Sequence, residues 1–389
     1  MEKNFLKIVF LSNYFNHHQK YLSEELNNLT EGNYYFIETE PMENERLNMG
    51  WGMNEKPCYV KQNYTNDEAK SECQSLINNA DVVIIGSAPE YLIDEIKNQG
   101  KLIFRYSERI FKKILLEPIK YPIRYYRFHK NNPNGSNIYM LCASAYTSSD
   151  YAKFGLFKNK CYKWGYFPEC KNYDVDELIS NKTQNSILWC ARLIDWKHPE
   201  IPVLVAEKLK SLNVDFKINI IGTGALEDEI KSMIKEKNLD DFIEIIGSMP
   251  PEKVRKNMEK SQIFLMTSDR QEGWGAVLNE AMNSACAVIA NKAAGAVPYL
   301  IKNGENGFAY TKCDIDDICR KIIELFNDKE KMKSVQKQAY YTISNEWNSK
   351  VAAERLIKLS NAILNGEQSP NLFENGICSK AEVIKNKGN

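Results

Sequence analysis

The sequence predicts an α/β protein made of two doubly wound units in tandem. Short, continuously apolar runs alternate with amphipathic stretches along most of the 389 residues. Such runs, separated by helical patterns, indicate parallel strands in a sheet that helices cover on both faces. The alternation breaks once, between residues 165 and 186, and then restarts. Each half is long enough to bury its own core, so we expect two domains.

The first half contains four apolar runs that we interpret as strands. They are Lys7–Leu11, Asp81–Gly86, Lys101–Arg105 and Ile138–Cys142. Between them, stretches such as Gln19–Leu29 and Tyr91–Asn98 place apolar side chains at helical spacing. We therefore predict a first domain over residues 1–165.

A polar, acidic stretch containing Pro168 then predicts a linker over residues 166–185. Five further strands are expected at Ser186–Cys190, Lys217–Ile221, Ile243–Ile246, Ile263–Met266 and Ala287–Ala290. Helices are expected between them, at Ile201–Leu212, Leu226–Lys237, Pro251–Lys260 and Gly275–Ser284. We predict a second domain over 186–344. Residues 345–389 would form a closing helix, Asn345–Leu364, and a polar tail that return to the first domain.

Composition and charge exclude several classes of protein. Hydrophobic residues make up 43% and charged residues 26%, which is typical of soluble globular proteins. Lys+Arg and Asp+Glu are both 51, so the chain lacks the basic excess of many nucleic-acid-binding proteins. No run approaches the roughly 20 apolar residues of a membrane-spanning helix, and the opening run lacks a signal-peptide cleavage site. We expect a cytoplasmic protein whose ten cysteines, none in a Cys-x-x-Cys pair, stay reduced.

The most informative segment runs from Ser268 to Met282, where a predicted strand leads through a Gly-rich loop into a helix. Glycines let the backbone approach a ligand, and a helix N-terminus suits a phosphate. Glu272 could reach a sugar hydroxyl, and Glu280, about a turn and a half into the helix, could bind a ribose. Taken alone, Glu272 is better explained as a helix-flanking acid and Glu280 as a surface residue, but the whole constellation favours a ligand site.

Two further pieces follow predicted strands. Arg192 and Lys197 come after Ser186–Cys190, where two cations could clamp a diphosphate. Gly222 and Gly224 come after the next strand, but Glu227 stands where the dinucleotide-binding fingerprint requires a third glycine.

The segment from Ile187 to Ala309 resembles the donor-binding domain of glycosyltransferase family 4. The resemblance rests on Ala191-Arg192-Leu193 with Lys197, Gly222 and Gly224, Gly247-Ser248, Glu272 and Glu280, Gly295–Pro298 and Gly304–Gly307. Ala191 and residues 284–286 depart from the family, which often has glycine there. The resemblance implies the GT-B fold, in which two Rossmann-like domains face each other across a cleft.

The resemblance also implies an activity: retaining transfer of a hexosyl group from a nucleotide-diphosphate sugar to a saccharide hydroxyl, in cell-surface polysaccharide or glycolipid synthesis. Arg192 and Lys197 would hold the diphosphate and Glu272 would contact the transferred sugar. Donor-binding residues carried over in this way are Gly222, Gly224, Ser248, Met249, Gly273, Trp274, Gly275, Ala276 and Glu280. No metal and no other cofactor is expected.

The acceptor side is expected in the first domain, where the sequence is less similar to the family. A polar loop after the first strand replaces the usual Gly-rich loop. The candidates are Asn13, His17, His18, Glu108 and Arg109. Alternatively, the two histidines are helix-start residues that face water, and Glu108 and Arg109 pair with each other.

Two Asp-x-Asp triplets, at 174–176 and 314–316, resemble metal ligands but are explained by helix N-termini. The segment Arg109–Lys130 carries seven Lys and Arg against one acid, Glu117, hence a net charge of +6, with interleaved aromatics. It suits an anionic membrane surface at the inner face of the cell membrane, and a lipid-linked acceptor. A solvated basic face is the alternative, and nucleic acid is not expected.

Rival functions remain within and outside this fold. A GT-B-type nucleotide-sugar epimerase or phosphorylase would change the chemistry, and a non-catalytic nucleotide-sugar-binding subunit would abolish it. A nicotinamide-dependent dehydrogenase is disfavoured because no Gly-x-Gly-x-x-Gly follows the first strand.

Overall fold

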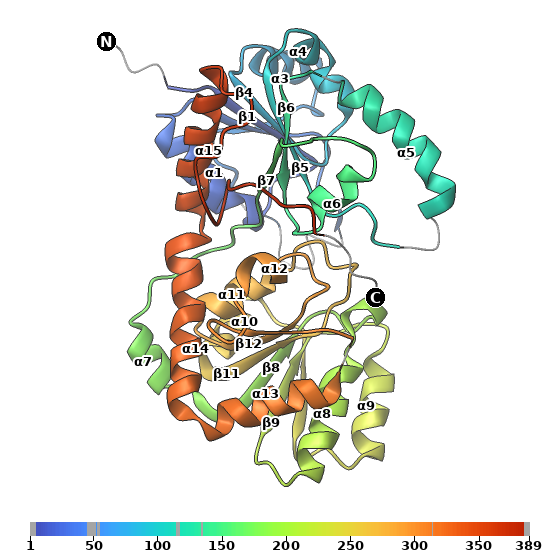
Figure 1. Cartoon of the computed structure of the whole chain (residues 1–389), viewed down its shortest axis with the longest axis vertical. Helices are drawn as coiled ribbons and strands as arrows, with labels where there is room; N and C mark the ends of the chain where they lie inside the picture. Colours follow the sequence, from blue (N-terminus) through green and yellow to red (C-terminus); the bar gives the residue numbers. More distant parts are fainter. Residues whose placement is uncertain are drawn as a thin grey trace. The chain divides into compact units, whose positions relative to one another are not determined.

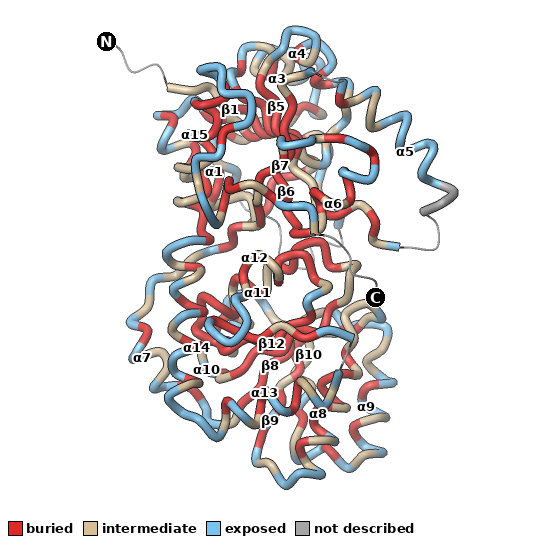
Figure 2. The backbone as a smooth tube through the Cα atoms, viewed as in Figure 1, coloured by how far each residue is buried: buried red, intermediate tan, exposed pale blue. Residues whose placement is uncertain are grey.

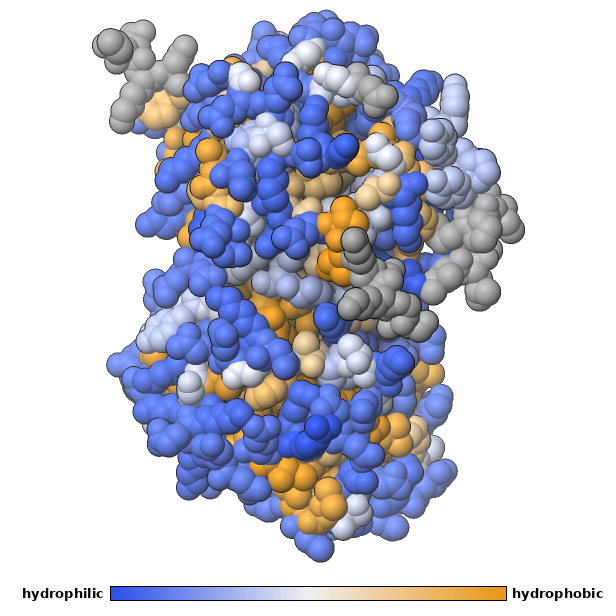
Figure 3. All heavy atoms as spheres, viewed as in Figure 1, coloured by the Kyte–Doolittle hydropathy of each residue, from blue (hydrophilic) through white to orange (hydrophobic). Residues whose placement is uncertain are grey.

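A computed structural model describes residues 5–44, 52, 55–113, 117–133, 135–312 and 314–384 (Figure 1). The chain divides into two compact units, Met1–Glu169 with Asn348–Asn389, and Cys170–Trp347. Each unit is a parallel sheet with helices, and the central strands of both sheets are buried, whereas the edge strands β3 and β10 are mostly not (Figure 2). Hydrophilic residues cover most of the face seen in Figure 3.

The sheet of the first unit has the order β3-β2-β1-β4-β5-β6-β7. The strands are β1 Ile8–Ser12, β2 Tyr34–Glu38, β3 Val60–Gln62, β4 Val82–Ile85, β5 Leu102–Ser107, β6 Ile138–Cys142 and β7 Cys161–Lys163. The four predicted strands are confirmed as β1, β4, β5 and β6. The prediction missed β2, β3 and β7. Of these, β3 and β7 have three residues each and include polar side chains, so they lack a continuous apolar run.

The helices of the first unit lie between these strands and after the second unit. They are α1 His17–Leu29, α3 Asp67–Asn78, η1 Glu90–Ile93, α4 Asp94–Asn98, α5 Glu117–Asn131, α6 Thr147–Ala152 and α15 Ser349–Leu364. The side chain of Asn16 accepts the N–H of His18 (2.8 Å) and so caps α1. Helix α1 packs against α15, so the C-terminal helix belongs to the first unit.

The sheet of the second unit has the order β10-β9-β8-β11-β12-β13. Its strands are β8 Thr183–Cys190, β9 Lys217–Ile221, β10 Ile243–Gly247, β11 Ser261–Met266, β12 Ala287–Asn291 and β13 Phe308–Tyr310. The five predicted strands are confirmed, and only the short edge strand β13 was missed. The helices are α7 Val175–Ser180, η3 Asp195–Lys197, α8 Glu200–Ser211, α9 Glu227–Glu236, α10 Pro251–Lys260, α11 Val277–Asn283, α12 Val297–Leu300, α13 Ile315–Asn327, α14 Lys329–Tyr341 and η4 Thr342–Glu346.

The stretch predicted as a linker is largely structured. It contains α7 and the start of β8, and from Cys170 onward it belongs to the second unit. Lys182 in this stretch is buried, and its ammonium donates to the carbonyls of Met258 (3.1 Å), Glu259 (3.1 Å), Ser261 (2.9 Å) and Ser284 (2.8 Å). A lysine in a polar stretch thus joins the C-terminal end of α10, the start of β11 and the residue that follows α11.

The end of the described chain is also packed, although its sequence reads as a polar tail. The N–H of Cys378 donates to the carbonyl of Lys163 (2.8 Å), and the N–H of Lys163 donates to that of Ser379 (2.8 Å). The N–H of Ala381 donates to Cys161 (3.0 Å), so the tail lies antiparallel to β7. It covers a sheet edge that would otherwise expose unpaired backbone groups.

Two further expectations from the sequence concern the cysteines and membrane-spanning helices. The described cysteines all carry free thiols. Among the described residues, we find no helix that combines the length and apolar character needed to cross a membrane.

Candidate functional site

Lys197 and Glu272 form an ion pair in the second unit. Lys197 ends η3 in the loop after β8, and Glu272 lies in the loop after β11, the neighbouring strand. Each side chain is only 12% exposed, and the ammonium also lies 4.2 Å from the ring centroid of Trp196. The structure therefore brings together two predicted catalytic residues at the carboxyl ends of adjacent parallel strands, where ligands bind in open α/β sheets.

Hydrogen bonds join the two loops that carry this pair. The indole N–H of Trp189 donates to the Thr267 hydroxyl (2.7 Å), and that hydroxyl donates to the Lys197 carbonyl. The N–H of Asp269 donates to the Trp196 carbonyl (3.0 Å). These contacts fix the loop after β11 against the loop after β8, so the pair is positioned by backbone as well as by charge.

Arg192, the third predicted catalytic residue, is exposed in the loop after β8. Within the described ranges, the structure records no hydrogen bond or ion pair of its guanidinium. It differs in this from Lys197, whose charge is already matched by a carboxylate. The guanidinium of Arg192 is accessible to an anion from solvent.

Gly222 and Gly224, which follow β9, pack against the backbone of the loop after β8. At Gly222, with φ of +140°, a Cβ would lie 1.9 Å from the Ala191 carbonyl oxygen. At Gly224 a Cβ would lie 2.3 Å from the Leu193 carbonyl oxygen. Both positions therefore require glycine because two backbones touch, which gives these predicted donor-binding residues a packing role of their own.

The loop that enters α11 is compact. Gly275 has φ of +96°, and a Cβ there would lie 2.4 Å from Met266 Cε, so only glycine fits without a shift. Gly273 is buried, and Ala276 immediately precedes α11, which begins two residues later than predicted. Trp274 is fully buried and its indole N–H donates to Asn279 (2.9 Å), so its side chain is a core anchor.

Glu280 lies in the first turn of α11, and its backbone carbonyl accepts from Arg255 (2.8 Å). The charge of its carboxylate affects the pKa of Cys190, the last residue of β8. The pKa of the Cys190 thiol is raised to about 12, mainly by burial and also by the negative charge of Glu280, while the positive charge of Lys197 acts in the opposite direction. Glu280 and Lys197 thus converge on the same strand end. Ser248 and Met249 follow β10, and the Met249 sulfur accepts from Asn257 (3.4 Å).

The predicted acceptor residues lie in the first unit, after β1 and β5. Asn13 follows β1 and accepts from the Ser12 hydroxyl (3.2 Å). His17 and His18 begin α1 with their ring centroids 3.9 Å apart, and His18 lies 5.9 Å from the ring of Tyr166. Tyr166, which the sequence did not single out, donates to Glu108 (2.6 Å). Through it, His18 and Glu108 face the same region.

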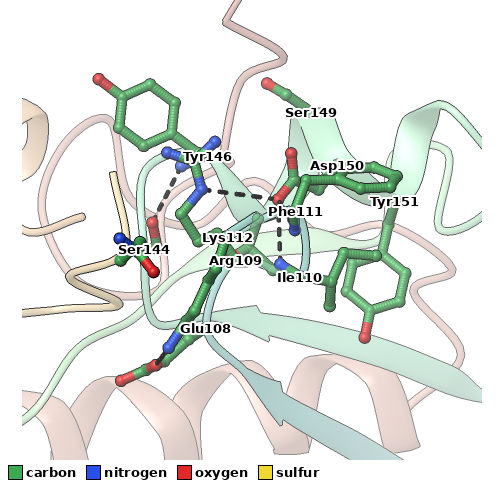
Figure 4. Close-up of polar contacts among 12 residues, drawn as sticks. Glu108, Arg109, Ile110, Phe111, Lys112, Ser144, Tyr146, Ser149, Asp150 and Tyr151 are labelled. Carbon is green, nitrogen blue, oxygen red and sulfur yellow. Dashed lines mark hydrogen bonds and ion pairs between the residues drawn. The ribbon is translucent and has the colours of Figure 1, made fainter. Parts of the chain in front are cut away.

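Glu108 and Arg109 have different partners, so the alternative that they pair with each other is wrong (Figure 4). Glu108 pairs with Lys112 (2.6 Å). The Arg109 Nε lies 3.9 Å from Asp150 Oδ2, and its guanidinium lies 4.6 Å from the ring centroid of Tyr146. The same Asp150 oxygen accepts the backbone N–H groups of Ile110 (3.0 Å) and Phe111 (3.2 Å). Asp150 therefore shapes the loop after β5, although only its place after a strand marks it in the sequence.

Both Asp-x-Asp triplets belong to helix caps, as predicted. Asp174 accepts the N–H groups of Asp176 and Glu177 (3.1 Å each) at the start of α7. Asp314 accepts the N–H of Asp317 (3.0 Å) at the start of α13. In the part of the chain that the structure describes, no group of three or more His, Cys, Asp and Glu could hold a metal ion.

The basic-aromatic segment divides into a core part and an exposed part. Phe111 stacks on Phe154 at 5.7 Å, and Phe128 contacts the same ring at 5.2 Å. On α5, by contrast, Ile123 is 70% and Tyr126 is 73% exposed, beside exposed basic residues. Figure 1 shows α5 as a helix that extends along the outside of the first unit. Residues 114–116 lie outside the described ranges.

The fold is that of the GT-B glycosyltransferases. The crystal structure of Anabaena Alr3699/HepE in complex with UDP has a TM-score of 0.69 and 14% identity, and covers 92% of this chain and 100% of that one. The crystal structure of TarM has a TM-score of 0.66 and 12% identity, and covers 92% and 99%.

Most of the second unit is similar to a glycosyltransferase family model. Residues 172–342 match the family model described as "Glycosyl transferases group 1". The amylovoran biosynthesis glycosyltransferase AmsK of Erwinia amylovora is 26% identical over 202 residues, 51% of this chain and 49% of that protein. A poly(ribitol-phosphate) alpha-N-acetylglucosaminyltransferase of Staphylococcus aureus is 24% identical over 182 residues, 46% and 36%. The chain spans about half the length of the first curated relatives it matches.

Proposed function

We propose that this protein is a retaining hexosyltransferase. It transfers the sugar of a nucleotide-diphosphate sugar to a hydroxyl of a saccharide acceptor, in the synthesis of a cell-surface polysaccharide or glycolipid. The observation that carries the proposal is the Lys197–Glu272 pair at the ends of β8 and β11, inside the segment that matches the group 1 model. The printed names of AmsK, for amylovoran biosynthesis, and HepE, bound to UDP, support the same assignment.

The chemistry follows from charge that develops on the leaving diphosphate. When the bond between the sugar and the diphosphate breaks, negative charge grows on the departing oxygen. Arg192, which is accessible, and Lys197 would bind that oxygen and stabilise the transition state. The acceptor oxygen bonds to the sugar on the same face, and its proton passes to the departing diphosphate. Glu272 accepts from hydroxyls of the transferred sugar, and Glu280 accepts from those of the ribose. This scheme requires no metal, because two cationic side chains supply the positive charge.

A peripheral membrane location fits the surface of α5. Ile123 and Tyr126 protrude beside Lys120, Arg127 and Lys130, which are exposed too. Apolar and aromatic tips among basic side chains suit the boundary of an anionic bilayer, where each Lys or Arg contributes about 1 kcal/mol. This location at the inner face of the cell membrane would bring the protein to a lipid-linked acceptor.

The membrane part is tested by co-sedimentation with anionic and neutral vesicles. We expect binding to anionic vesicles that high salt abolishes, since the Debye length falls from about 10 Å at 0.1 M to about 3 Å at 1 M. Ile123→Ser combined with Tyr126→Ser should remove binding. Leu212→Ser, at an exposed apolar residue of the second unit, should not. Equal binding by all variants would refute the role of α5.

The transfer itself is tested by a thermal-shift panel of nucleotide diphosphates and nucleotide sugars, followed by product analysis. A ligand at 100 times its Kd stabilises the protein by about 2.7 kcal/mol. A nucleotide-sugar epimerase would release an isomerised nucleotide sugar without acceptor. A non-catalytic subunit would bind the donor and give no product with any saccharide. No shift with any nucleotide would refute the proposed function.

A further inference from the structure

A cavity of about 360 Å³ lies in the first unit, at the carboxyl ends of β2 and β3. Thr39 directly follows β2, and Asn63 directly follows β3. Its lining includes Thr39, Asn63, Tyr64, Lys70, Gln74 and Tyr91. Ligands bind at this edge of open α/β sheets, and small-molecule sites have volumes of roughly 300–1,000 Å³. Position and size therefore both suit a small ligand.

The side chain of Asn63 indicates that a ligand of this cavity is polar. The residue is only 7% exposed, yet for its side-chain amide the structure records no hydrogen bond to any described residue. Its backbone N–H is used, since it donates to the Glu38 carbonyl (3.0 Å). Buried side-chain amides normally have partners, and this amide lines a cavity. An amide both donates and accepts, which matches a sugar hydroxyl, itself a donor and an acceptor.

The aromatic wall indicates a saccharide among polar ligands. Two tyrosines line the cavity: Tyr91, which is 67% exposed, and Tyr64, which follows β3 in the sequence. A tyrosine ring offers an apolar face and a polar tip, as a pyranose does. The cation of the cavity, Lys70, is already paired with Asp67 (2.9 Å). Because that charge is matched, the lining favours a neutral sugar ring over a phosphate.

Hydrogen bonds and one ion pair hold the walls of the cavity in place. Glu38, at the end of β2, accepts from the N–H of Phe15 (2.8 Å) and the amide of Gln62 (3.0 Å). The Gln62 amide also donates to the Tyr64 hydroxyl (2.9 Å). On the other side, the guanidinium of Arg105 donates two hydrogen bonds to the carboxylate of Glu90 (2.5 and 3.0 Å), which anchors η1 and hence Tyr91. A site built on such supports binds with little reorganisation.

We propose that this cavity binds one neutral sugar ring of the acceptor, with Asn63 hydrogen-bonding its hydroxyls and Tyr91 stacking on its apolar face. The proposal rests on the proposed glycosyl transfer and specifies its acceptor subsite. The cavity lies beside the loop after β1, because the N–H of Thr39, one of its lining residues, donates to the carbonyls of Ser12 (3.0 Å) and Asn13 (2.9 Å).

The test is saturation-transfer NMR on the full chain, with the methyl glycosides of glucose, galactose, mannose and N-acetylglucosamine as probes. We expect at least one glycoside to bind, and Asn63→Ala and Tyr91→Ala to weaken it roughly tenfold. Tyr91→Phe should retain binding. Tyr126→Ala, which removes a similarly exposed tyrosine from α5, is the matched control.

UDP, titrated into the same samples, separates this proposal from the proposed function. If UDP binds but no glycoside does, or if glycoside binding survives both alanine variants, the cavity proposal is overturned and the donor site stands. If a glycoside binds through Asn63 and Tyr91 but neither UDP nor any nucleotide of the thermal-shift panel binds, the cavity stands as a saccharide site and the transferase proposal fails. Unchanged urea unfolding profiles of the variants show that the first unit, which carries both substitutions, still folds.

Discussion

Substitution of the Lys197–Glu272 pair separates a structural from a catalytic role. The perturbation is a cycle of three variants: Lys197→Met, Glu272→Gln and the double variant. Both side chains are 12% exposed, so either single change leaves a largely buried group without its partner. Breaking a buried pair in this way costs roughly 3–5 kcal/mol of stability, whereas removal of both partners costs much less.

Activity should follow a different pattern from stability. Lys197 also serves the leaving diphosphate, so Lys197→Met should lower kcat/KM by about 10²–10³, or roughly 2.7–4 kcal/mol. The double variant should regain most of the free energy of unfolding but none of this activity. Urea unfolding and an assay of nucleotide diphosphate release measure the two quantities on the same samples.

The exposed pair Lys208–Asp316 provides the control, and Lys208→Met should change neither quantity measurably. A double variant with near-normal turnover would refute the reasoning, because Lys197 would then only neutralise Glu272. A Lys197→Met variant that is fully active would refute it as well.

Three further outcomes are expected. Lys182→Met should lower the free energy of unfolding by about 3 kcal/mol or more, since hydrogen bonds to a charged group contribute roughly 1.5–3 kcal/mol each; urea unfolding that shows a loss below about 1 kcal/mol would contradict the four-carbonyl role. Transfer activity should survive excess EDTA, because Asp174 and Asp314 cap helices; loss on chelation with recovery on adding manganese would be the opposite result. Burial lowers the pKa of Lys380 to about 8, so the folded state releases this proton before the unfolded state does. The free energy of unfolding should therefore rise with pH between about 8 and 10.4 in the wild type relative to Lys380→Gln, and parallel profiles would contradict it.

The order of elements could be read from the sequence because central parallel strands are apolar on both faces. Phe104 and Leu141, for example, lie in runs that nothing but a buried strand explains. Three-residue strands such as β3 and β7 carry no such signal, since their pairing depends on neighbours distant in sequence. Lys182 shows the same limit. Its ammonium is held by carbonyls at the C-terminal ends of α10 and α11, and no local sequence pattern predicts those contacts.

Local sequence places the residues proposed for the donor side more directly than those proposed for the acceptor side, for a physical reason. Lys197, Glu272 and Glu280 each follow a strand within a short loop or the first turn of a helix, so local sequence places them. Asp150 and Tyr166 contact Arg109 and Glu108 from segments about 40 and 58 residues away. Those contacts exist only in the folded chain. The roles of all these residues toward a donor and an acceptor stay predictions.

The tail that lies along β7 has a consequence for how the protein is made. Residues 348–384 emerge from the ribosome after the whole second unit, yet they supply α15 against α1 and the cover on the β7 edge. Until then, the nascent first unit presents an uncovered strand edge and an unfilled helix face. The second unit, by contrast, is continuous and needs nothing from later in the chain. Synthesis from the N-terminus thus allows the second unit to finish folding first, although the first unit begins the chain.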